Sequence, residues 1–285
     1  EDRIAAVRGR RVWDSRGRPT VEAEIHTVGG AVGRAIAPAG ASTGSGEALD
    51  KRDGGARLGG WDVQGAVDAV NDIVGPAIVG MDASEQRAID QTMLSLDGTP
   101  GKTRLGGNAT IAVSLAAAHA AAAAREMPLW RYLRGIEGAE GPVLMPLPEI
   151  QIFGGGAHAN ARIDMQDVMV MPVGARSFVE AMEWTAEVYR AAGARMAASG
   201  RMQGVADEGG WWPNFKTNEE ALAECVAAIE DAGLTPGRDM AISLDIAATQ
   251  LHEAGRYRLS LEERTLGRDA FLDLLLGWTD TYPIV

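Results

Sequence analysis

Residues 205–214 read VADEGGWWPN, and this stretch decides how the rest of the chain is interpreted. Asp207 and Glu208 place two carboxylates side by side at a point where a helical pattern has ended. The two glycines that follow allow backbone angles that other residues resist, and Pro213 keeps a helix from starting there. The stretch is therefore either a polar site loop or an ordinary turn with solvated acids and two indoles packed on the core.

The charge balance limits the ligands that such a site would take. The 285 residues carry a formal net charge of −12, and no run of Lys and Arg offsets it. This argues against a nucleic-acid partner and against binding to an anionic membrane surface. A phosphate or carboxylate ligand would need a divalent cation in an acid-rich site to invert the local field.

The cysteine content and the apolar runs bear on the compartment. Cys225 is the only cysteine, so no disulfide within the chain and no thiolate metal site is expected. The N-terminus shows no basic segment followed by an apolar one, as a signal peptide would. The longest apolar run, residues 111–124, is mostly alanine and short for a membrane span. We expect a cytoplasmic protein.

The first part of the chain predicts an α+β domain. Residues 4–11, 20–26 and 31–37 alternate in the manner of strands and indicate an antiparallel meander. Residues 63–93 and 108–132 carry apolar side chains at helical spacing, with a narrow alanine face suited to close packing.

A polar, glycine-rich connector at residues 135–142 follows these helices. A chain of this length commonly folds as one large or two ordinary domains. We therefore predict two domains, residues 1–138 and residues 139–285, with the boundary near residue 138.

Residues 38–47 read PAGASTGSGE and form a second candidate site loop. Exposed backbone N–H groups in such a loop suit phosphate, and a serine hydroxyl suits Mg²⁺. No Gly-Lys-Ser/Thr follows, so the loop is not a nucleotide P-loop. A flexible linker is the competing interpretation.

The second part of the chain alternates strands and helices. Ser177 caps a predicted helix over residues 178–198, and Asn218 caps one over residues 219–232. A short strand over residues 241–245 precedes a charged helix, and one more strand is expected to start near Tyr282.

Apolar strands bounded by polar or acidic residues and separated by helices indicate a (β/α) barrel. Functional residues would then lie at the C-terminal ends of successive strands. Four residues occupy such places: His158, Asp167, Glu208 and Asp245. We expect them to converge above the barrel mouth. Taken singly, they could equally be a turn histidine, a cap and two loop acids.

Short motifs along the chain resemble the enolase family, in the family's order and over nearly the whole length. These are Asp14-Ser15-Arg16-Gly17, Gly40-Ala41-Ser42-Thr43-Gly44, Glu47-Ala48-Leu49, Arg52-Asp53-Gly54, Asn108-Ala109, Val113-Ser114-Leu115-Ala116, Gly155-Gly156, His158-Ala159, Met171-Pro172-Val173-Gly174-Ala175, Asp207-Glu208-Gly209-Gly210 and Leu244-Asp245. The resemblance implies an α+β N-terminal capping domain followed by an enolase-type (β/α) barrel.

The resemblance also implies an activity, the dehydration of 2-phosphoglycerate to phosphoenolpyruvate with two Mg²⁺ ions. By this resemblance Asp245 ligates the first Mg²⁺ and Ser42 the second. Gly40, Ala41 and Ser42 form the mobile loop that contacts substrate. Mg²⁺ stabilises the extra negative charge that forms when a proton leaves the carbon beside a carboxylate, and the enolase superfamily is an established example of this chemistry.

The remaining implied roles fall on the second part of the chain. Glu208 is the general acid that helps the hydroxyl leave, and His158 and Gln166 contact substrate. Asp167 takes the place of the family's second catalytic-site glutamate. The implied ligand is a small phosphorylated carboxylate, and enolases are commonly dimers or larger homo-oligomers.

Four departures from the family's pattern cluster near this site. Asp167 is one methylene shorter than glutamate, which retracts its carboxylate by roughly 1.5 Å. The usual asparagine before the Gly-Gly-x-His motif is missing, since the chain reads Phe153-Gly154 there. Trp211-Trp212 replaces Phe-Ala, and Gln250 replaces a glutamate. Two alternatives follow: a paralogue with a changed substrate, such as carboxyphosphonoenolpyruvate synthase of phosphonate antibiotic pathways, or an enolase-like binding protein without catalysis.

The extent of the barrel is a further expectation. A complete barrel takes about 250 residues, and residues 139–285 supply little more than half of that. We expect the chain to be the N-terminal part of a longer protein; the alternatives are that it associates with its missing half or is a catalytically inactive remnant. Two more Mg²⁺ carboxylates, the lysine base and the basic residues that hold phosphate would then follow Val285.

Overall fold

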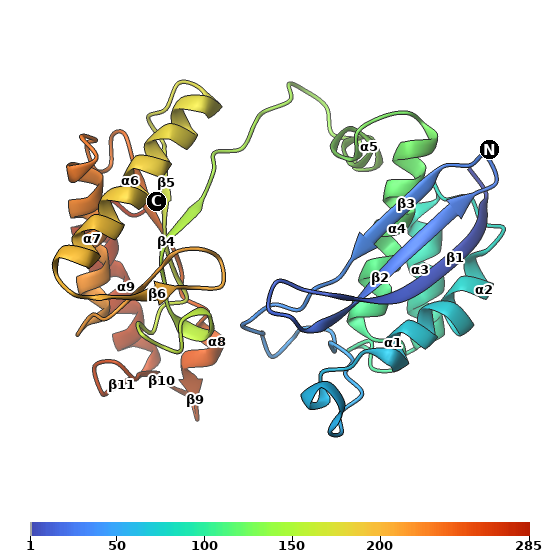
Figure 1. The fold of residues 1–285 in the computed structure, drawn as a ribbon, viewed down its shortest axis with the longest axis horizontal. Helices are drawn as coiled ribbons and strands as arrows, with labels where there is room; N and C mark the ends of the chain where they lie inside the picture. Colours follow the sequence, from blue (N-terminus) through green and yellow to red (C-terminus); the bar gives the residue numbers. More distant parts are fainter. Residues whose placement is uncertain (1) are drawn as a thin grey trace. The chain divides into compact units, whose positions relative to one another are not determined.

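The computed structural model describes residues 2–285, which divide into two compact units (Figure 1). The first unit runs to Gly40 and continues from Gly46 to Pro142. The second unit comprises Ala41–Ser45 and Val143–Val285. The sequence places the boundary near residue 138, whereas the units divide after Pro142, and five residues of the early loop belong with the second unit.

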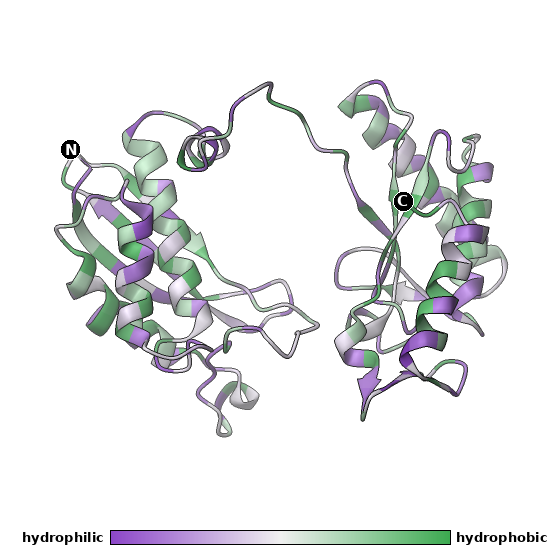
Figure 2. Ribbon diagram, turned by 180° about the vertical axis from the view of Figure 1, so that it is seen from behind, coloured by the Kyte–Doolittle hydropathy of each residue, from purple (hydrophilic) through white to green (hydrophobic). Residues whose placement is uncertain are grey.

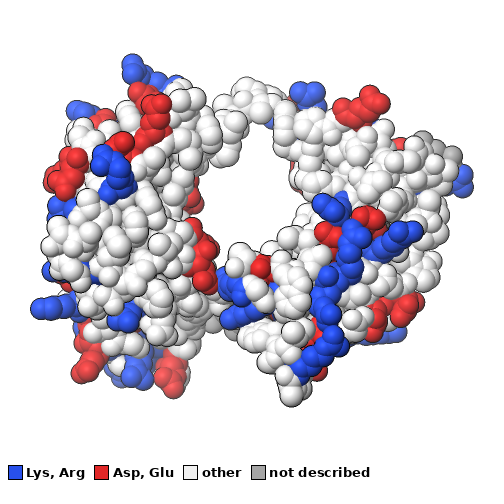
Figure 3. Space-filling model, viewed as in Figure 1, with Lys and Arg blue, Asp and Glu red and all other residues white. Residues whose placement is uncertain are grey.

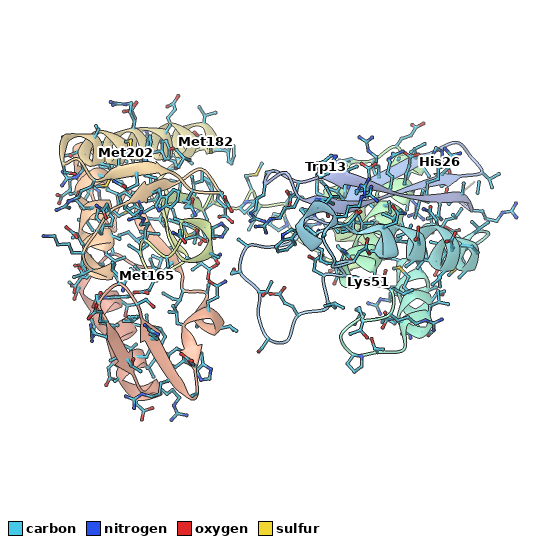
Figure 4. All side chains as sticks on the ribbon, turned by 60° about the horizontal axis from the view of Figure 1, so that its bottom comes forward. Trp13, His26, Lys51, Met165, Met182 and Met202 are labelled. Atoms are coloured by element: carbon cyan, nitrogen blue, oxygen red, sulfur yellow. The ribbon has the colours of Figure 1, made fainter. Side chains whose placement is uncertain are left out.

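The first unit is an antiparallel sheet with helices on one face. Its elements are β1 (Ile4–Trp13), β2 (Pro19–Thr27), β3 (Val32–Ile36), η1 (Arg57–Gly60), α1 (Gln64–Asp68), η2 (Ala69–Val74), α2 (Gly75–Ile78), α3 (Gln86–Asp97), α4 (Gly107–Ala124) and α5 (Leu129–Ile136). The strand order is β1-β2-β3, as the meander predicted from the sequence requires. In Figure 4, Trp13 and His26 mark the opposite ends of this sheet.

Helix α4 is the core helix of the first unit, since its alanine-rich surface packs on β2 and β3. The approach is so close that a Cβ added to Gly33 would lie 2.1 Å from the backbone oxygen of Ala116. The helix is long and apolar enough to span a membrane, yet 67% of it is buried inside the protein. Burial of this kind explains its apolar composition as that of a core helix.

The other face of the first sheet is charged. Arg10 pairs with Glu22 and Glu24, and Arg34 also pairs with Glu22. In Figure 3 basic and acidic side chains lie next to each other on this unit. Cross-strand pairs of opposite charge suit a solvated sheet face, and each exposed pair adds little to stability.

The helical region predicted for residues 63–93 is interrupted. The chain forms continuous helical turns from Gln64 to Ile78, including the π-helical segment η2, and then leaves the helix at Val79, where ψ is 131°. Gly80 adopts a φ of +89°, which continues the turn before α3 begins. Apolar periodicity carries across this break because both segments face the same core.

The second unit holds a five-stranded sheet. Its elements are β4 (Ile150–Gly154), η3 (Gly156–His158), β5 (Asp167–Met171), α6 (Phe178–Ala198), β6 (Met202–Val205), β7 (Trp211–Pro213), α7 (Asn218–Asp231), β8 (Ala241–Asp245), α8 (Ala248–Leu251), β9 (His252–Glu253), β10 (Arg256–Leu259), β11 (Arg264–Leu266) and α9 (Arg268–Thr281). The strand order is β6-β7-β4-β5-β8, and β5 runs antiparallel to both of its neighbours.

The two faces of this sheet differ in polarity. Ile152, Val168, Val170 and Ile242 are fully buried in a core with residues of α6, α7 and α9. The helices in Figure 2 accordingly change between hydrophobic and hydrophilic colouring around their axes. The alternate residues of the strands, including Asp167 on β5, point to the opposite face. This opposite face, on which Asp167 lies, corresponds to the interior of a barrel.

Among residues 2–285 the sheet is open, so the fold is an α+β N-terminal domain followed by part of a (β/α) barrel. Ile284 pairs with Ile242 as a parallel neighbour of β8, which agrees with the strand expected to start near Tyr282. The charged helix expected after Asp245 corresponds to α9. It is preceded by a small sheet, β11-β10-β9, that the sequence did not predict.

The two long helices of this unit begin at side-chain caps. Ser177 accepts a hydrogen bond from the Glu180 N–H, as the sequence predicts for α6. The prediction that Asn218 caps α7 is wrong, because Thr217 accepts from the Glu220 N–H at 3.1 Å. Asn218 is fully buried inside the first turn, where its side chain bonds Asp164.

Candidate active site

Polar side chains gather at one edge of the five-stranded sheet. Strand β4 ends at Gly154 and β8 ends at Asp245, while β5 begins at Asp167. Asp167 is paired in register with both Gly154 and Asp245. The sequence interpretation placed Asp167 at the end of a strand. It lies at the beginning instead, and because β5 is antiparallel its beginning shares an edge with the ends of its neighbours.

Two glutamine amides join the carboxylates at this edge. Gln151 Nε2 donates to Asp167 Oδ1, and Gln166 Nε2 lies 3.3 Å from Asp167 Oδ2. Gln166 Nε2 also donates to Asp245 Oδ2 at 3.0 Å. Asp167 and Asp245 are therefore linked through Gln166, and the two acids that the sequence placed together do lie together.

Burial raises the pKa of the Asp167 carboxyl, since only 3% of the residue is exposed. Hydrogen bonds from Gln151 and Gln166 and the nearby His158 act in the opposite direction, while the charge of Asp245 adds to the increase in pKa. Desolvation is the largest of these effects because it penalises the charged form. Asp167 is thus a carboxyl whose proton affinity is raised by its position inside the site.

His158 and Glu208 meet beside Asp167. The Nε2 atom of His158 lies 3.5 Å from Glu208 Oε1, and their side chains are 3% and 51% exposed. One ligand atom from each of His158, Glu208 and Asp167 lies within 4.8 Å of the other two. A buried imidazole and a solvent-facing carboxylate therefore lie next to each other, as proton transfer to a bound molecule requires.

His158 keeps one unused polar atom. Its Nδ1 is buried without a hydrogen-bond partner in the described part of the chain. His158 is the last residue of the short helix η3, and its backbone N–H donates to Gly155 O at 3.0 Å. These backbone contacts fix the position of the His158 Cα, from which the imidazole extends. A buried unpaired ring nitrogen commonly marks a place where a ligand or water completes the bonding.

The stretch from residue 205 to residue 214 is both a turn and part of this site. It connects β6 to β7, and Ala206 and Gly210 close it with an N–H···O bond of 2.8 Å. Trp211 stacks on Tyr189 of α6 at 4.6 Å, and its indole Nε1 donates to the Tyr189 carbonyl at 2.9 Å. Packing of this indole on the unit's own helix explains it without a changed substrate.

A similar packing reason accounts for the missing asparagine before the Gly-Gly-x-His motif. A Cβ added to Gly154 would lie 2.3 Å from the Cβ of Ala206, which is far inside ordinary contact distance. It would also lie 3.3 Å from the amide of Gln151. Gly154 therefore leaves room for Ala206 and Gln151, and the three positions form one packing unit beneath the Glu208 loop.

Comparison with known families agrees with the geometry. Residues 4–133 match the family described as "Enolase, N-terminal domain". Residues 142–285 match the family described as "Enolase, C-terminal TIM barrel domain". The chain belongs to the enolase family. Its two compact units correspond to the two matched regions, and the open sheet is the part of an enolase barrel that these residues supply.

The residues present fit the Mg²⁺ that enolases use. Asp245 Oδ1 accepts from the Ala247 N–H at 2.8 Å and Oδ2 from Gln166, which orients the carboxylate and leaves lone pairs on both oxygens. Gln166 Oε1 is buried without a partner among the described residues, which supplies a second oxygen acceptor beside Asp245. Hard oxygen donors of this kind suit Mg²⁺.

The other predicted loop residues are less defined. Ser42 is half-buried in the segment Ala41–Ser45, which belongs to the second unit. Within residues 2–285 it forms no hydrogen bond with Asp245. Gly40 lies on the other side of the division, in the first unit. The roles of Gly40, Ala41 and Ser42 in binding remain predictions.

Two residues of this network were not singled out in the sequence. Gln151 is 6% exposed in a strand that otherwise reads as apolar, and Tyr189 lies on an amphipathic helix. A polar side chain inside an apolar strand is a usable signal, because burial without a partner is unfavourable. Tyr189 gave no such signal, since tyrosine is common on the inner face of a helix.

Proposed function

We propose that this chain is an Mg²⁺-dependent lyase of enolase type that acts on 2-phosphoglycerate or a close analogue. The observation that supports this most is the convergence of His158, Asp167, Glu208 and Asp245 at one edge of the barrel sheet, in a chain of the enolase family. The substrate would be a small phosphorylated carboxylate.

In this proposal each side chain has one role in the dehydration. Glu208 donates a proton to the hydroxyl that leaves as water, and its half-exposed side chain beside His158 gives it access to a ligand. His158 hydrogen-bonds the substrate through Nδ1, which has no partner within the described chain, and Gln166 contacts the substrate from beside Asp245. Asp167 holds Gln166 in place and is a second carboxyl near the reacting groups.

Asp245 would hold Mg²⁺, with Ser42 as the ligand of a second ion. When bound, Mg²⁺ stabilises the negative charge that develops on the substrate. Lys216 is the one lysine of the second unit; it is exposed, and its N–H donates to Glu220. The described residues thus supply the acid and a metal ligand, and the proton acceptor is not found in this cluster.

Isothermal calorimetry with 2-phosphoglycerate tests the proposal, with and without Mg²⁺. We expect binding that requires Mg²⁺ and that Asp245→Ala abolishes. Asp269→Ala is the matched control, because Asp269 is 85% exposed and pairs with the neighbouring Arg268. Equal binding without Mg²⁺, or equal binding by Asp245→Ala, would contradict the proposal.

A paralogue with a changed reaction is the second candidate, of the kind represented by carboxyphosphonoenolpyruvate synthase. The short carboxylate of Asp167 supports it, because two glutamine amides hold that carboxylate back at the strand edge. Formation of phosphoenolpyruvate from 2-phosphoglycerate, followed by ultraviolet absorbance, separates the candidates. Mg²⁺-dependent binding without turnover would favour the paralogue, and normal turnover would exclude it.

A binding protein without catalysis is the third candidate. Binding of the ligand that is indifferent to both Mg²⁺ and Asp245→Ala would favour it. We further propose a cytoplasmic location, which the single reduced and buried Cys225 supports, and a homo-oligomer of two or more copies. Light scattering of the purified protein measures the second of these.

A further inference from the structure

The peptide between Gly209 and Gly210 is held from both sides. The hydroxyl of Tyr189 donates to the Gly209 carbonyl at 2.7 Å. The N–H of Gly210 donates to Gln151 Oε1 at 2.8 Å. Both groups belong to one planar peptide unit, so the two bonds together fix the rotation of that plane.

The same glutamine extends the link to the acid cluster. Gln151 Nε2 donates to Asp167 Oδ1, and Asp167 connects through Gln166 to Asp245. The orientation of the amide is fixed by chemistry, because its oxygen faces a donor and its nitrogen faces a carboxylate. Gln151 is 6% exposed, so its bonds are largely shielded from water.

We propose that Gln151 and Tyr189 are positioning residues that hold Glu208 in register with Asp167 through the Gly209–Gly210 peptide. This inference rests on the roles of Glu208 and Asp167 in the proposed function. Glu208 itself has a 51% exposed side chain in a five-residue turn, and its Oε1 lies 3.5 Å from Nε2 of His158. Its position therefore depends on how the turn is held.

The backbone bonds within the turn are local. Gly209 has a φ of +96° and Ala206 bonds across the turn at both ends, to Gly209 N and to Gly210 O. Those bonds close the turn upon itself and do not tie it to β4 or α6. The contacts with Gln151 and Tyr189 do, because these residues lie on β4 and α6 respectively.

Substitutions separate the two ends of the link. Gln151→Leu removes both of its bonds at similar volume, and Tyr189→Phe removes only a hydroxyl. Gln151→Asn is shorter by roughly 1.5 Å, so it reaches either the peptide or Asp167 but not both. The matched controls are Gln203→Leu, on β6 with one long bond of 3.4 Å to Met202, and Tyr282→Phe, whose hydroxyl donates to Glu219 at 2.9 Å.

Amide hydrogen exchange of Gly210, measured by NMR, is the test. We expect exchange to become about three- to tenfold faster in Gln151→Leu and Tyr189→Phe, since one hydrogen bond contributes about 0.5–1.5 kcal/mol. The controls and the amides of β5 should keep their rates. An increase of less than about twofold at Gly210, or an equal increase throughout the sheet, overturns the proposal.

Turnover supplies the second readout and separates the two claims. Where the protein forms phosphoenolpyruvate, we expect kcat to fall about tenfold in Gln151→Leu with KM little changed, with a smaller loss in Gln151→Asn. Unchanged kcat in Gln151→Leu overturns the positioning role. If the wild type shows no turnover, the proposed function fails, and the exchange of Gly210 still decides whether the link exists. Tyr189→Phe keeps the test available if Gln151→Leu does not fold.

Discussion

Gly154→Ala tests the packing beneath the Glu208 loop. The added Cβ would lie 2.3 Å from the Cβ of Ala206, whereas carbon atoms pack at about 3.5–4.0 Å, so the overlap is about 1.2 Å or more. Overpacking of this kind destabilises a fold by about 1–3 kcal/mol. We expect that loss in the free energy of unfolding measured with urea, together with lower turnover, because Ala206 begins the turn that carries Glu208.

The double variant makes this prediction specific. Ala206→Gly removes the opposing Cβ, and the next nearest atoms belong to the Gln151 amide at 3.3 Å. We expect Gly154→Ala with Ala206→Gly to recover most of the stability, with a coupling energy of about 1–2 kcal/mol in the double-mutant cycle. Gly277→Ala, where the added Cβ meets nothing within 4 Å, should be neutral or stabilising by up to about 1 kcal/mol. A coupling energy near zero would show that the Cβ atoms at positions 154 and 206 do not compete for the same space.

Three further predictions concern the same unit. The stability of the wild type relative to Asp167→Asn should fall as pH rises, because the contribution of the protonated carboxyl is fully present below about pH 3.9 and is lost as pH rises through the raised folded-state pKa. Urea unfolding at several pH values measures this difference in stability, and a difference that does not change with pH would contradict the prediction. Trp211→Phe should lower the free energy of unfolding by about 1–2 kcal/mol, since it removes the indole hydrogen bond to the Tyr189 carbonyl and part of the stacked ring. The exposed Trp130→Phe should change the free energy of unfolding by less than about 0.5 kcal/mol, and equal effects of the two substitutions would argue against a contribution from the bond. Cys225, fully buried with a pKa raised to about 12 by burial, should resist iodoacetamide at pH 8 until the protein unfolds, and rapid alkylation of the folded chain would show that it is accessible.

Much of the fold follows from local pattern. The meander, the helix from Phe178 to Ala198 and the short strand ending at Asp245 are read from alternation, helical spacing and a serine cap. The direction of β5 could not be predicted in this way, because the residue pattern alone does not say whether a strand pairs parallel or antiparallel with its neighbour. The resulting error put Asp167 at the wrong end of its strand, yet at the right edge of the sheet.

The sequence predicted several residues of the candidate site but not the hydrogen bonds that join them. His158, Glu208 and Asp245 each follow a strand or turn signal that the sequence displays. Gln151 bonds Asp167 across 16 residues of the chain and the Gly210 N–H across 59 residues. These residues come together only in the folded protein, so no local sequence motif predicts the hydrogen bonds between them.

Rates of phosphoenolpyruvate formation by the wild type and by Glu208→Gln, at saturating Mg²⁺ and 2-phosphoglycerate, test the central claim most directly. Glu208→Gln keeps the size of the side chain and removes its transferable proton. We expect Mg²⁺-dependent turnover by the wild type and a loss of roughly 100-fold or more in the variant, the usual contribution of a general acid. Full turnover by Glu208→Gln, or none by the wild type, would contradict it.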